Sequence, residues 1–360
     1  MGVRRHIVAI VATGLALLLV APESVPRPRF EVVADHLDNP RQVIVHGDAL
    51  YVAEAGTGGA LCTGDRGCAG LTGAVTRVRD GEATRVQRGL LSFTLDSFTL
   101  PALWVVGVDA LTVRDGRLYG IASGTCDLSR ASAPVRAQAG RVLRLDGGSE
   151  VTPVGDASTI ECTADRGPVT NPYGPETNPY GIADWRGRFA VADQFGNDVV
   201  VVSPRRTTVA TVLPEWHASP TSLTVGPDGA LYIGTFPQNG GSDGAMVYRL
   251  APGSRTATVY ADNLAAITAI AFGPDGTLYV VEWTDRFYVQ PDGPIPGDGA
   301  VVAVPWGGGS SGRRTYGTRF LHFPTGVAVH DGSLYVASLE PAEEWPGRSG
   351  TGQLLRIPLG

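Results

Sequence analysis

The segment Pro220–Thr235, PTSLTVGPDGALYIGT, decides the fold because five other segments of the chain follow the same pattern. An alternating apolar run leads into a Gly/Asp turn, and a second apolar run follows that carries Leu-Tyr, replaced once by Phe189-Ala190. Alternation with a period of two predicts β-strands, and proline and glycine predict the tight turn between them. The other copies are PRQVIVHGDALYVAE at 40–54, VDALTVRDGRLYGIA at 108–122, PYGIADWRGRFAVAD at 179–193, ITAIAFGPDGTLYVVE at 267–282 and PTGVAVHDGSLYVAS at 324–338.

A third apolar run follows each pair, usually after a glycine, as in GAVTRV from Gly73 and GQLLRI from Gly352. These two glycines lie 279 residues apart over five steps, which gives a mean repeat of about 56 residues. Repeats of this length with several short strands are typical of a β-propeller with one blade per repeat. The sequence therefore predicts an all-β, six-bladed, NHL-like propeller.

A fourth strand completes each expected blade except the last, because the chain stops at Gly360 directly after the third strand of the sixth repeat. The segment Phe30–Asp38, FEVVADHLD, precedes the first repeat and has the fourth-strand pattern. We expect it to pair onto the last blade and close the ring, which removes an open sheet edge. The other fourth strands are expected from Glu82, Ser149, Thr207, Thr256 and Arg314.

Residues 25–360 are expected to form one propeller domain behind a targeting segment at 1–24. Arg4 and Arg5 precede the apolar stretch Ile7–Ala21, which is typical of a signal peptide and short for a membrane span. We expect export to a secreted or extracytoplasmic, cell-envelope location. The alternative is an uncleaved anchor, and this segment would then be the only membrane contact.

The formal net charge of −6 argues against nucleic acid as a partner. We expect a monomer whose partner is a small molecule or a component of the envelope or extracellular space.

The turns between first and second strands lie on one face of the expected disc, and the other connections lie on the opposite face. All the long insertions fall in those other connections, so we call this side the loop-rich face. Long, variable loops on a rigid scaffold are where function usually resides. The insertions are 56–72, 123–139, 158–177, 236–243, 284–298 and 339–351.

Four cysteines, Cys62, Cys68, Cys126 and Cys162, fall on the loop-rich face. An even number in an exported chain predicts disulfides, and a zinc site is disfavoured because no histidine lies close by. Of three connectivities we favour Cys62–Cys68 with Cys126–Cys162, because the first closes a local loop and the second ties neighbouring loops. The other two connectivities stay open.

Several segments taken together resemble the exported ScyD/ScyE family of NHL-like six-bladed propellers: VVADHLDNPRQVIV, ALYVAEAG, NPYGIAD, VADQFGN and PTGVAV. The likeness runs over nearly the whole chain from Phe30, with departures at Val108-Asp109-Ala110 and at GGGSSGRR, 307–314. The resemblance implies an extracytoplasmic bacterial propeller, and it implies no established reaction.

Alignment of the six repeats places polar residues at the mouth of the central channel on the loop-rich face. The starts of first strands and the ends of second strands supply them. We expect these side chains to bind a ligand. The set is Glu54, Asp193, Glu282, Asn178, Asp109, Arg41 and Tyr180.

Three of these residues, Glu54, Asp193 and Glu282, end second strands in alternate repeats and are expected around the channel axis with approximate threefold symmetry. Carboxylate oxygens suit Ca²⁺ or Mg²⁺, so these three are the candidate metal ligands. The alternative is that they are solvated or paired with Arg41 at a wet channel mouth.

Two functions are compatible with this pattern. The first is a ligand-binding or scaffold protein that acts through the loop-rich face. The alternative is a metal-dependent hydrolase of lactonase type with a divalent cation at the channel mouth. No histidine falls at the expected mouth and no HExxH motif occurs, so we favour binding and assign no catalytic residue. Trp283 is expected either to pack in the core or to form an apolar pocket wall.

Overall fold

The computed structural model describes the chain between residues 30 and 359 with several gaps. The described ranges are 30–59, 61–62, 68–94, 105–129, 131–163, 175–215, 218–236, 244–284, 289–290, 293–294, 299–339 and 350–359. The predicted targeting segment, Met1–Ser24, lies outside them, as do large parts of the predicted insertions. Among the described residues, no helix has the length and apolar character needed to cross a membrane.

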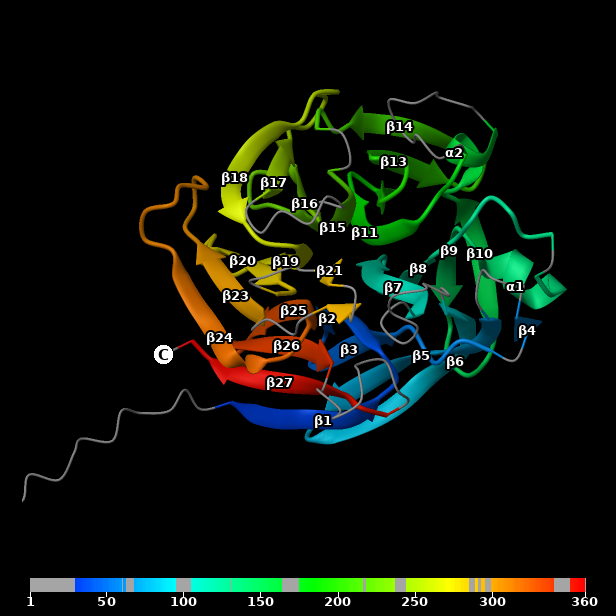
Figure 1. The fold of residues 1–360 in the computed structure, drawn as a ribbon, viewed down its shortest axis with the longest axis horizontal. Coiled ribbons are helices and arrows are strands. Elements are labelled where there is room, and N and C mark those ends of the chain that lie inside the picture. The colour runs from blue at the N-terminus through cyan, green and yellow to red at the C-terminus, as the bar shows by residue number, and fades with distance from the viewer. Residues whose placement is uncertain are drawn as a thin grey trace, which may run out of the picture.

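Four sheets have four antiparallel strands each, and they follow the predicted repeats three to six (Figure 1). Repeat three forms β11 (Pro179–Trp185), β12 (Arg188–Asp193), β13 (Asp198–Ser203) and β14 (Arg206–Val212). Repeat four forms β15 (Pro220–Val225), β16 (Leu231–Thr235), β17 (Ala245–Leu250) and β18 (Thr258–Leu264). Repeat five forms β19 (Ile267–Phe272), β20 (Leu278–Glu282), β23 (Gly299–Val304) and β24 (Arg314–Leu321). Repeat six forms β25 (Pro324–His330), β26 (Ser333–Leu339) and β27 (Gly352–Pro358), with β1 (Glu31–Leu37) as the fourth strand.

The first two repeats differ from the prediction because they share one nine-stranded sheet, so the structure has four separate blades where six were expected. The physical reason is the length of β5 and β6, which have 12 and 13 residues and extend past their own repeat. The end of β6 pairs with the start of β7, where Ser92 lies opposite Gly107 and Thr94 opposite Val105. The strands are β2 (Pro40–His46), β3 (Ala49–Glu54), β4 (Leu61–Cys62), β5 (Cys68–Arg79), β6 (Glu82–Thr94), β7 (Val105–Arg114), β8 (Arg117–Ala122), β9 (Arg141–Leu145) and β10 (Val151–Asp156).

The N-terminal strand β1 pairs with the C-terminal strand β27, as the sequence predicts for Phe30–Asp38. Glu31 lies opposite Arg356 and Leu37 opposite Gly352, and Figure 1 shows the two strands side by side at the edge of the molecule. The first strands of the six repeats lie innermost. Each contacts the next around the centre, in the order β2, β7, β11, β15, β19, β25 and back to β2.

Apolar side chains of neighbouring sheets pack against each other to form the core. Tyr232 and Val247 of one sheet, for example, pack with Ile270 and Val280 of the next. The predicted tight turns are present, and Gly229 and Gly276 have φ of +72° and +84°, a conformation that favours glycine.

Two short helices lie in segments that the sequence predicts to be loops. They are α1 (Ala133–Gln138) and α2 (Thr159–Thr163), and a two-stranded hairpin, β21 (Val289–Gln290) with β22 (Gly293–Pro294), lies in a third. The helices belong to the connections that follow β8 and β10, so they lie on the loop-rich face.

Candidate functional site at the central channel

A hydrogen bond recurs at the end of the second strand in four repeats, and we call it the loop latch. The last residue of the strand, or in repeat six the residue before it, accepts a hydrogen bond from a backbone N–H in the connection that leads into the first strand of the same repeat. The pairs are Glu54 with Asp38 N, 2.7 Å, Asp193 with Asn178 N, 2.8 Å, Glu282 with Ala265 N, 2.9 Å, and Ser338 with His322 N, 3.2 Å. Each latch ties the end of the connection, just before the first strand, to the second strand of the same blade.

Glu54 is fully buried and has several partners besides its latch. Arg85 on β6 donates to it from Nε and from the terminal nitrogen, at 3.0 Å and 2.6 Å, and Thr76 donates its hydroxyl. The hydrogen bond to Glu54 raises the pKa of the Arg85 guanidinium. Glu54 therefore points along its own sheet toward β5 and β6 and not toward a shared channel site.

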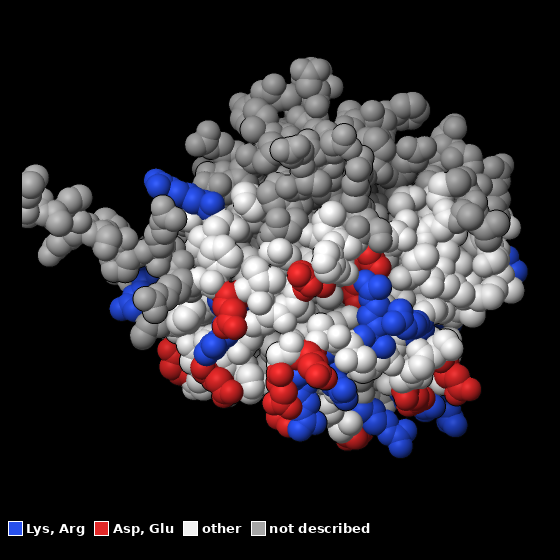
Figure 2. Space-filling model, turned by 90° about the horizontal axis from the view of Figure 1, so that it is seen from below, with Lys and Arg blue, Asp and Glu red and all other residues white. Residues whose placement is uncertain are grey.

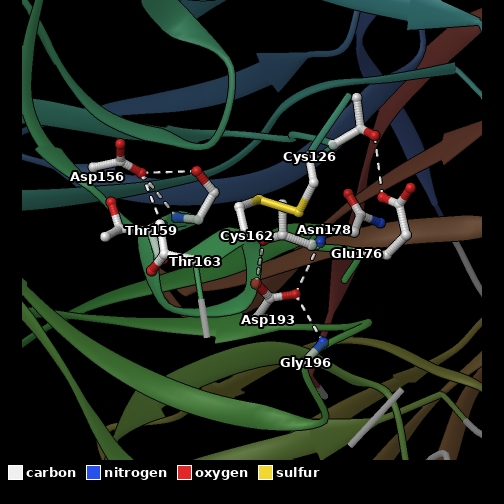
Figure 3. The surroundings of a disulfide bond; sticks show 12 residues. Cys126, Asp156, Thr159, Cys162, Thr163, Glu176, Asn178, Asp193 and Gly196 are labelled. Carbon is white, nitrogen blue, oxygen red and sulfur yellow. Dashed lines mark hydrogen bonds between the residues drawn. A yellow bond between two sulfur atoms is a disulfide. The ribbon is translucent and has the colours of Figure 1, made fainter. Parts of the chain in front are cut away.

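Asp193 is also fully buried, and its carboxylate organises the loop at the start of β11 (Figure 3). It accepts the N–H of Asn178 at 2.8 Å, the N–H of Gly196 at 3.1 Å and the hydroxyl of Thr177. Burial raises the pKa of the Asp193 carboxyl, while these hydrogen bonds act in the opposite direction. Asn178 in turn donates its side-chain amide to Gln194, 2.7 Å away.

The predicted metal set of Glu54, Asp193 and Glu282 is therefore not assembled. Within the described ranges, no group of three or more His, Cys, Asp or Glu side chains is placed to hold a metal ion. The reason is geometric, because only the first strand of each blade borders the channel, and the three acids stand one strand further out. Their oxygens are engaged by donors of their own blades.

The starts of the first strands do bring side chains together across blades. Each first strand has a register shift at the start of its pairing with the second strand, and the residue at this β-bulge is directed toward the next repeat in several blades. Thr221, Thr268 and Thr325 occupy this position and donate their hydroxyls to the backbone carbonyls of Ile267, Pro324 and Pro40, at 2.6 to 2.8 Å. Sequence reasoning missed this role, although threonine at the same place in three repeats was a visible signal. The shifts are at Pro40/Val43, Val108/Ala110, Pro179/Gly181, Pro220/Ser222, Ile267/Ala269 and Pro324/Gly326.

Arg41 and Asp109 occupy the same bulge position in repeats one and two, and there they form a buried ion pair. Arg41 Nε donates to Asp109 at 3.2 Å, and its terminal nitrogens donate to the carbonyls of Pro40 and Val105. Ser123 also donates its hydroxyl to Asp109. Burial raises the pKa of the Asp109 carboxyl, and Arg41 opposes that shift.

Tyr180 holds the bulge position of repeat three and remains partly exposed. Burial raises the pKa of its phenol to about 12, and the charges of Arg41 and Asp109 act on it in opposite directions. Of the predicted set, the structure therefore brings Arg41, Asp109 and Tyr180 together at the channel, whereas Asn178 takes part in the latch beside Asp193.

The disulfide between Cys126 and Cys162 is present, as predicted (Figure 3). It joins the connection after β8 to helix α2, next to Thr125, which donates its hydroxyl to Glu176 at 3.0 Å. Cys68 is also disulfide-bonded, and its backbone is paired with that of Cys62 across β4 and β5. The Cys62 side chain lies outside the described residues, so the Cys62–Cys68 bond stays a prediction.

Replacing Cys126 and Cys162 together by serine should lower the free energy of unfolding by about 4 kcal/mol. The bond closes a loop with a sequence separation of 36, and cross-linking a loop of this size restricts the unfolded chain by about that amount. Denaturant unfolding of the double variant would measure the effect, with Thr125→Ser as a neighbouring control. An unchanged midpoint would show that the bond does not stabilise the fold.

Trp283 is buried and packs against Phe323 and Phe236, with ring centroids 4.7 and 5.8 Å away. This apolar cluster also contains Ala266 and Leu339 and lies at the roots of three neighbouring loops. Of the two roles expected for Trp283, packing is the one that these contacts support.

No protein-family model matches the chain, and a search of curated proteins finds no match. Among solved structures, the chain is similar to an oxidoreductase from Thermus thermophilus described as a glucose dehydrogenase. The identity is 17%, the TM-score 0.52, and the match covers 91% of this chain and 99% of that one. It is also similar to the PQQ-bound aldose sugar dehydrogenase of Streptomyces coelicolor, with 11% identity, a TM-score of 0.50, and coverage of 93% and 99%. At these identities the likeness shows the fold alone, which is a β-propeller.

Proposed function

We propose that this protein is an exported six-bladed propeller, similar to ScyD/ScyE proteins, that binds a hydroxyl-rich small ligand at the rim of its central channel on the loop-rich face. The observation that carries the proposal is the placement of Tyr180, a residue of intermediate exposure whose phenol lies close enough to the buried pair Arg41–Asp109 to be affected by both charges. A phenol ring can pack on a sugar-like ring while its hydroxyl forms a hydrogen bond.

The blade count of six treats the nine-stranded sheet as two blades joined at β6 and β7. Two contacts support a ring closed between the first and last repeats. The first is the pairing of β1 with β27, and the second is the hydrogen bond from Thr325 in repeat six to the carbonyl of Pro40 in repeat one. The cyclic order of contacts among the six innermost strands agrees with this count.

An exported location is supported by the Cys126–Cys162 disulfide, because such bonds persist in oxidising compartments.

A small molecule remains the proposed partner in preference to nucleic acid. On the side of the molecule seen in Figure 2, acidic and basic side chains of the described residues are interspersed. The structure also contains opposite-charge pairs such as Arg79–Asp48 and Arg85–Asp38. A nucleic-acid surface would instead collect one positive patch.

Binding is favoured over metal-dependent hydrolysis because the acids that would hold the metal already accept hydrogen bonds from their own blades. Glu54 and Asp193 are fully buried behind these donors. A cation at either carboxylate would have to displace Arg85 or the backbone N–H groups of the loop latch.

Binding of D-glucose and sorbitol, measured by saturation-transfer NMR, tests the proposal. Tyr180→Ala should abolish the signal, and Tyr180→Phe should weaken binding about fivefold, the value of one hydrogen bond of about 1 kcal/mol. Tyr51→Phe is the matched control, because Tyr51 lies near the turns at the other end of its blade, where it packs on His46. Equal binding by Tyr180→Ala, or no binding by the parent, would refute the proposal.

Metal and lactone experiments on the same proteins distinguish the binding function from metal-dependent hydrolysis. We expect Ca²⁺, Mg²⁺ and EDTA to leave the melting temperature unchanged and a small lactone to remain intact. A Ca²⁺-dependent rise in melting temperature that Glu54→Gln removes, together with lactone turnover, would favour the hydrolase.

A further inference from the structure

A cavity of about 360 Å³ lies in the central channel, toward the turns that join first and second strands. Four inner strands, β2, β7, β11 and β15, form its walls. This end of the channel is opposite the rim that carries Tyr180, so the cavity is separate from the proposed ligand site. Val225 lines it and keeps 36% of its surface exposed, which shows that the cavity opens to solvent.

The walls are mainly aliphatic, and one residue among them carries a charge. Leu111, Ile182 and Leu223 lie at the same level of their strands, Ile44 lies one residue further along its own strand, and Gln42, Thr112 and Thr224 add polar groups. Asp184 on β11 is the only ionisable residue that lines the described part of this cavity.

The repeats show how unusual this carboxylate is. In the alignment by inner strands, Asp184 occupies the position held by Val45, Val113, Val225, Phe272 and Val329 in the other five copies. Because the other five copies all have an apolar side chain at this position, the fold itself requires only an apolar residue there. A charged residue at this one position is not needed for packing.

The surroundings of Asp184 leave part of its carboxylate without a donor. Its backbone N–H donates to Thr112 at 3.1 Å, but its buried Oδ1 atom has no hydrogen-bond partner among the described residues. Burial raises the pKa of this carboxyl, and the nearby charges of Arg114 and Asp115 act in opposite directions. Arg114 lies over the ring of Phe189, 4.9 Å from its centroid, and 3.8 Å from Asp115.

We propose that this cavity is a second binding site, which takes a small organic cation with its ammonium group on Asp184 and its apolar body against the aliphatic walls. An ammonium group supplies the opposite charge and hydrogen-bond donors for a carboxylate that keeps part of its surface exposed. The volume falls within the range of sites that enclose small ligands, and aliphatic walls with a few polar groups are typical of them.

Cyclohexylamine is a suitable probe, with cyclohexanol and cyclohexanecarboxylate as the neutral and anionic compounds of the same shape. Calorimetric titration of the full chain should show saturable binding of the amine, at least tenfold tighter than that of either analogue. Asp184→Val introduces the residue that four other repeats carry, so this variant should fold with a melting temperature at or above that of the parent.

Asp184→Val and Asp184→Asn should each weaken amine binding at least tenfold. Asp115→Asn, which removes an exposed acid near the same opening, should change it less than twofold. Asp184→Asn keeps the test valid if the valine variant does not fold. The proposal is overturned if the parent does not bind the amine saturably, if cyclohexanol binds equally well, or if the Asp184 variants bind as the parent does. Sugar binding at Tyr180 should be the same in all these variants, because the two sites lie at opposite ends of the channel.

Discussion

A chain that begins at residue 39 should be much less stable than one that begins at residue 30, and it should aggregate. The nine residues removed include β1, whose Leu37 and Ala34 are buried. Uncovering a buried leucine alone costs about 3 kcal/mol, and the backbone groups of β27 would become an open strand edge. Asp38 adds to the loss, since it binds Arg85 and the N–H of Gly350, each at 2.7 Å.

Thermal unfolding and light scattering of the two truncated proteins would measure this difference. The chain that begins at residue 30 is the matched control, because it lacks the same upstream segment and retains β1. Equal melting temperatures and equal solubility would show that β1 does not hold the first and last repeats together.

Replacing Asp109 by alanine should lower the free energy of unfolding by about 3–5 kcal/mol. The exposed fraction of Arg41 is only 5%, so the substitution leaves a buried guanidinium without its counter-charge. Denaturant unfolding would measure the loss, and Asp115→Ala is the control for removing an exposed acid from the same strand pair. A change below 1 kcal/mol would contradict the importance of the pair.

The double variant Arg41→Thr with Asp109→Thr should recover a large part of that loss. A buried ion pair contributes little net stability when both charges are removed together. Threonine at both positions would reproduce the bonds that Thr221, Thr268 and Thr325 make to the next repeat. A double variant as unstable as Asp109→Ala would show that the loss does not arise from an uncompensated charge.

The strands and their order could be predicted because the sequence repeats its pattern, and each copy supports the assignment of the others. The pairing of Phe30–Asp38 with the last strand was predictable for the same reason, since one fourth strand was missing at the C-terminal end and one was present at the N-terminal end. The fusion of the first two repeats was not predictable. It depends on how far β5 and β6 extend, and the alternation of side chains does not fix the point at which a strand stops.

The channel mouth was predicted in part. Alignment placed Arg41, Asp109 and Tyr180 correctly at equivalent positions, but it treated the ends of second strands as if they faced the same axis. Side-chain direction there depends on the β-bulge at which each inner strand begins to pair with its second strand, and a bulge has no sequence signature in these repeats. Asp184 could have been found from the sequence, because it is the only charged residue in a column of apolar ones.

The loop latch has a consequence for how this architecture can change. Glu54, Asp193, Glu282 and Ser338 each hold the backbone close to the point where a loop leaves its blade. The residues of the loop beyond that point are therefore not needed to hold the strands of the blade in place. Segments of different length and sequence can therefore be exchanged on the loop-rich face while the ring of inner strands keeps its dimensions, so that the binding surface can change without a change of the fold.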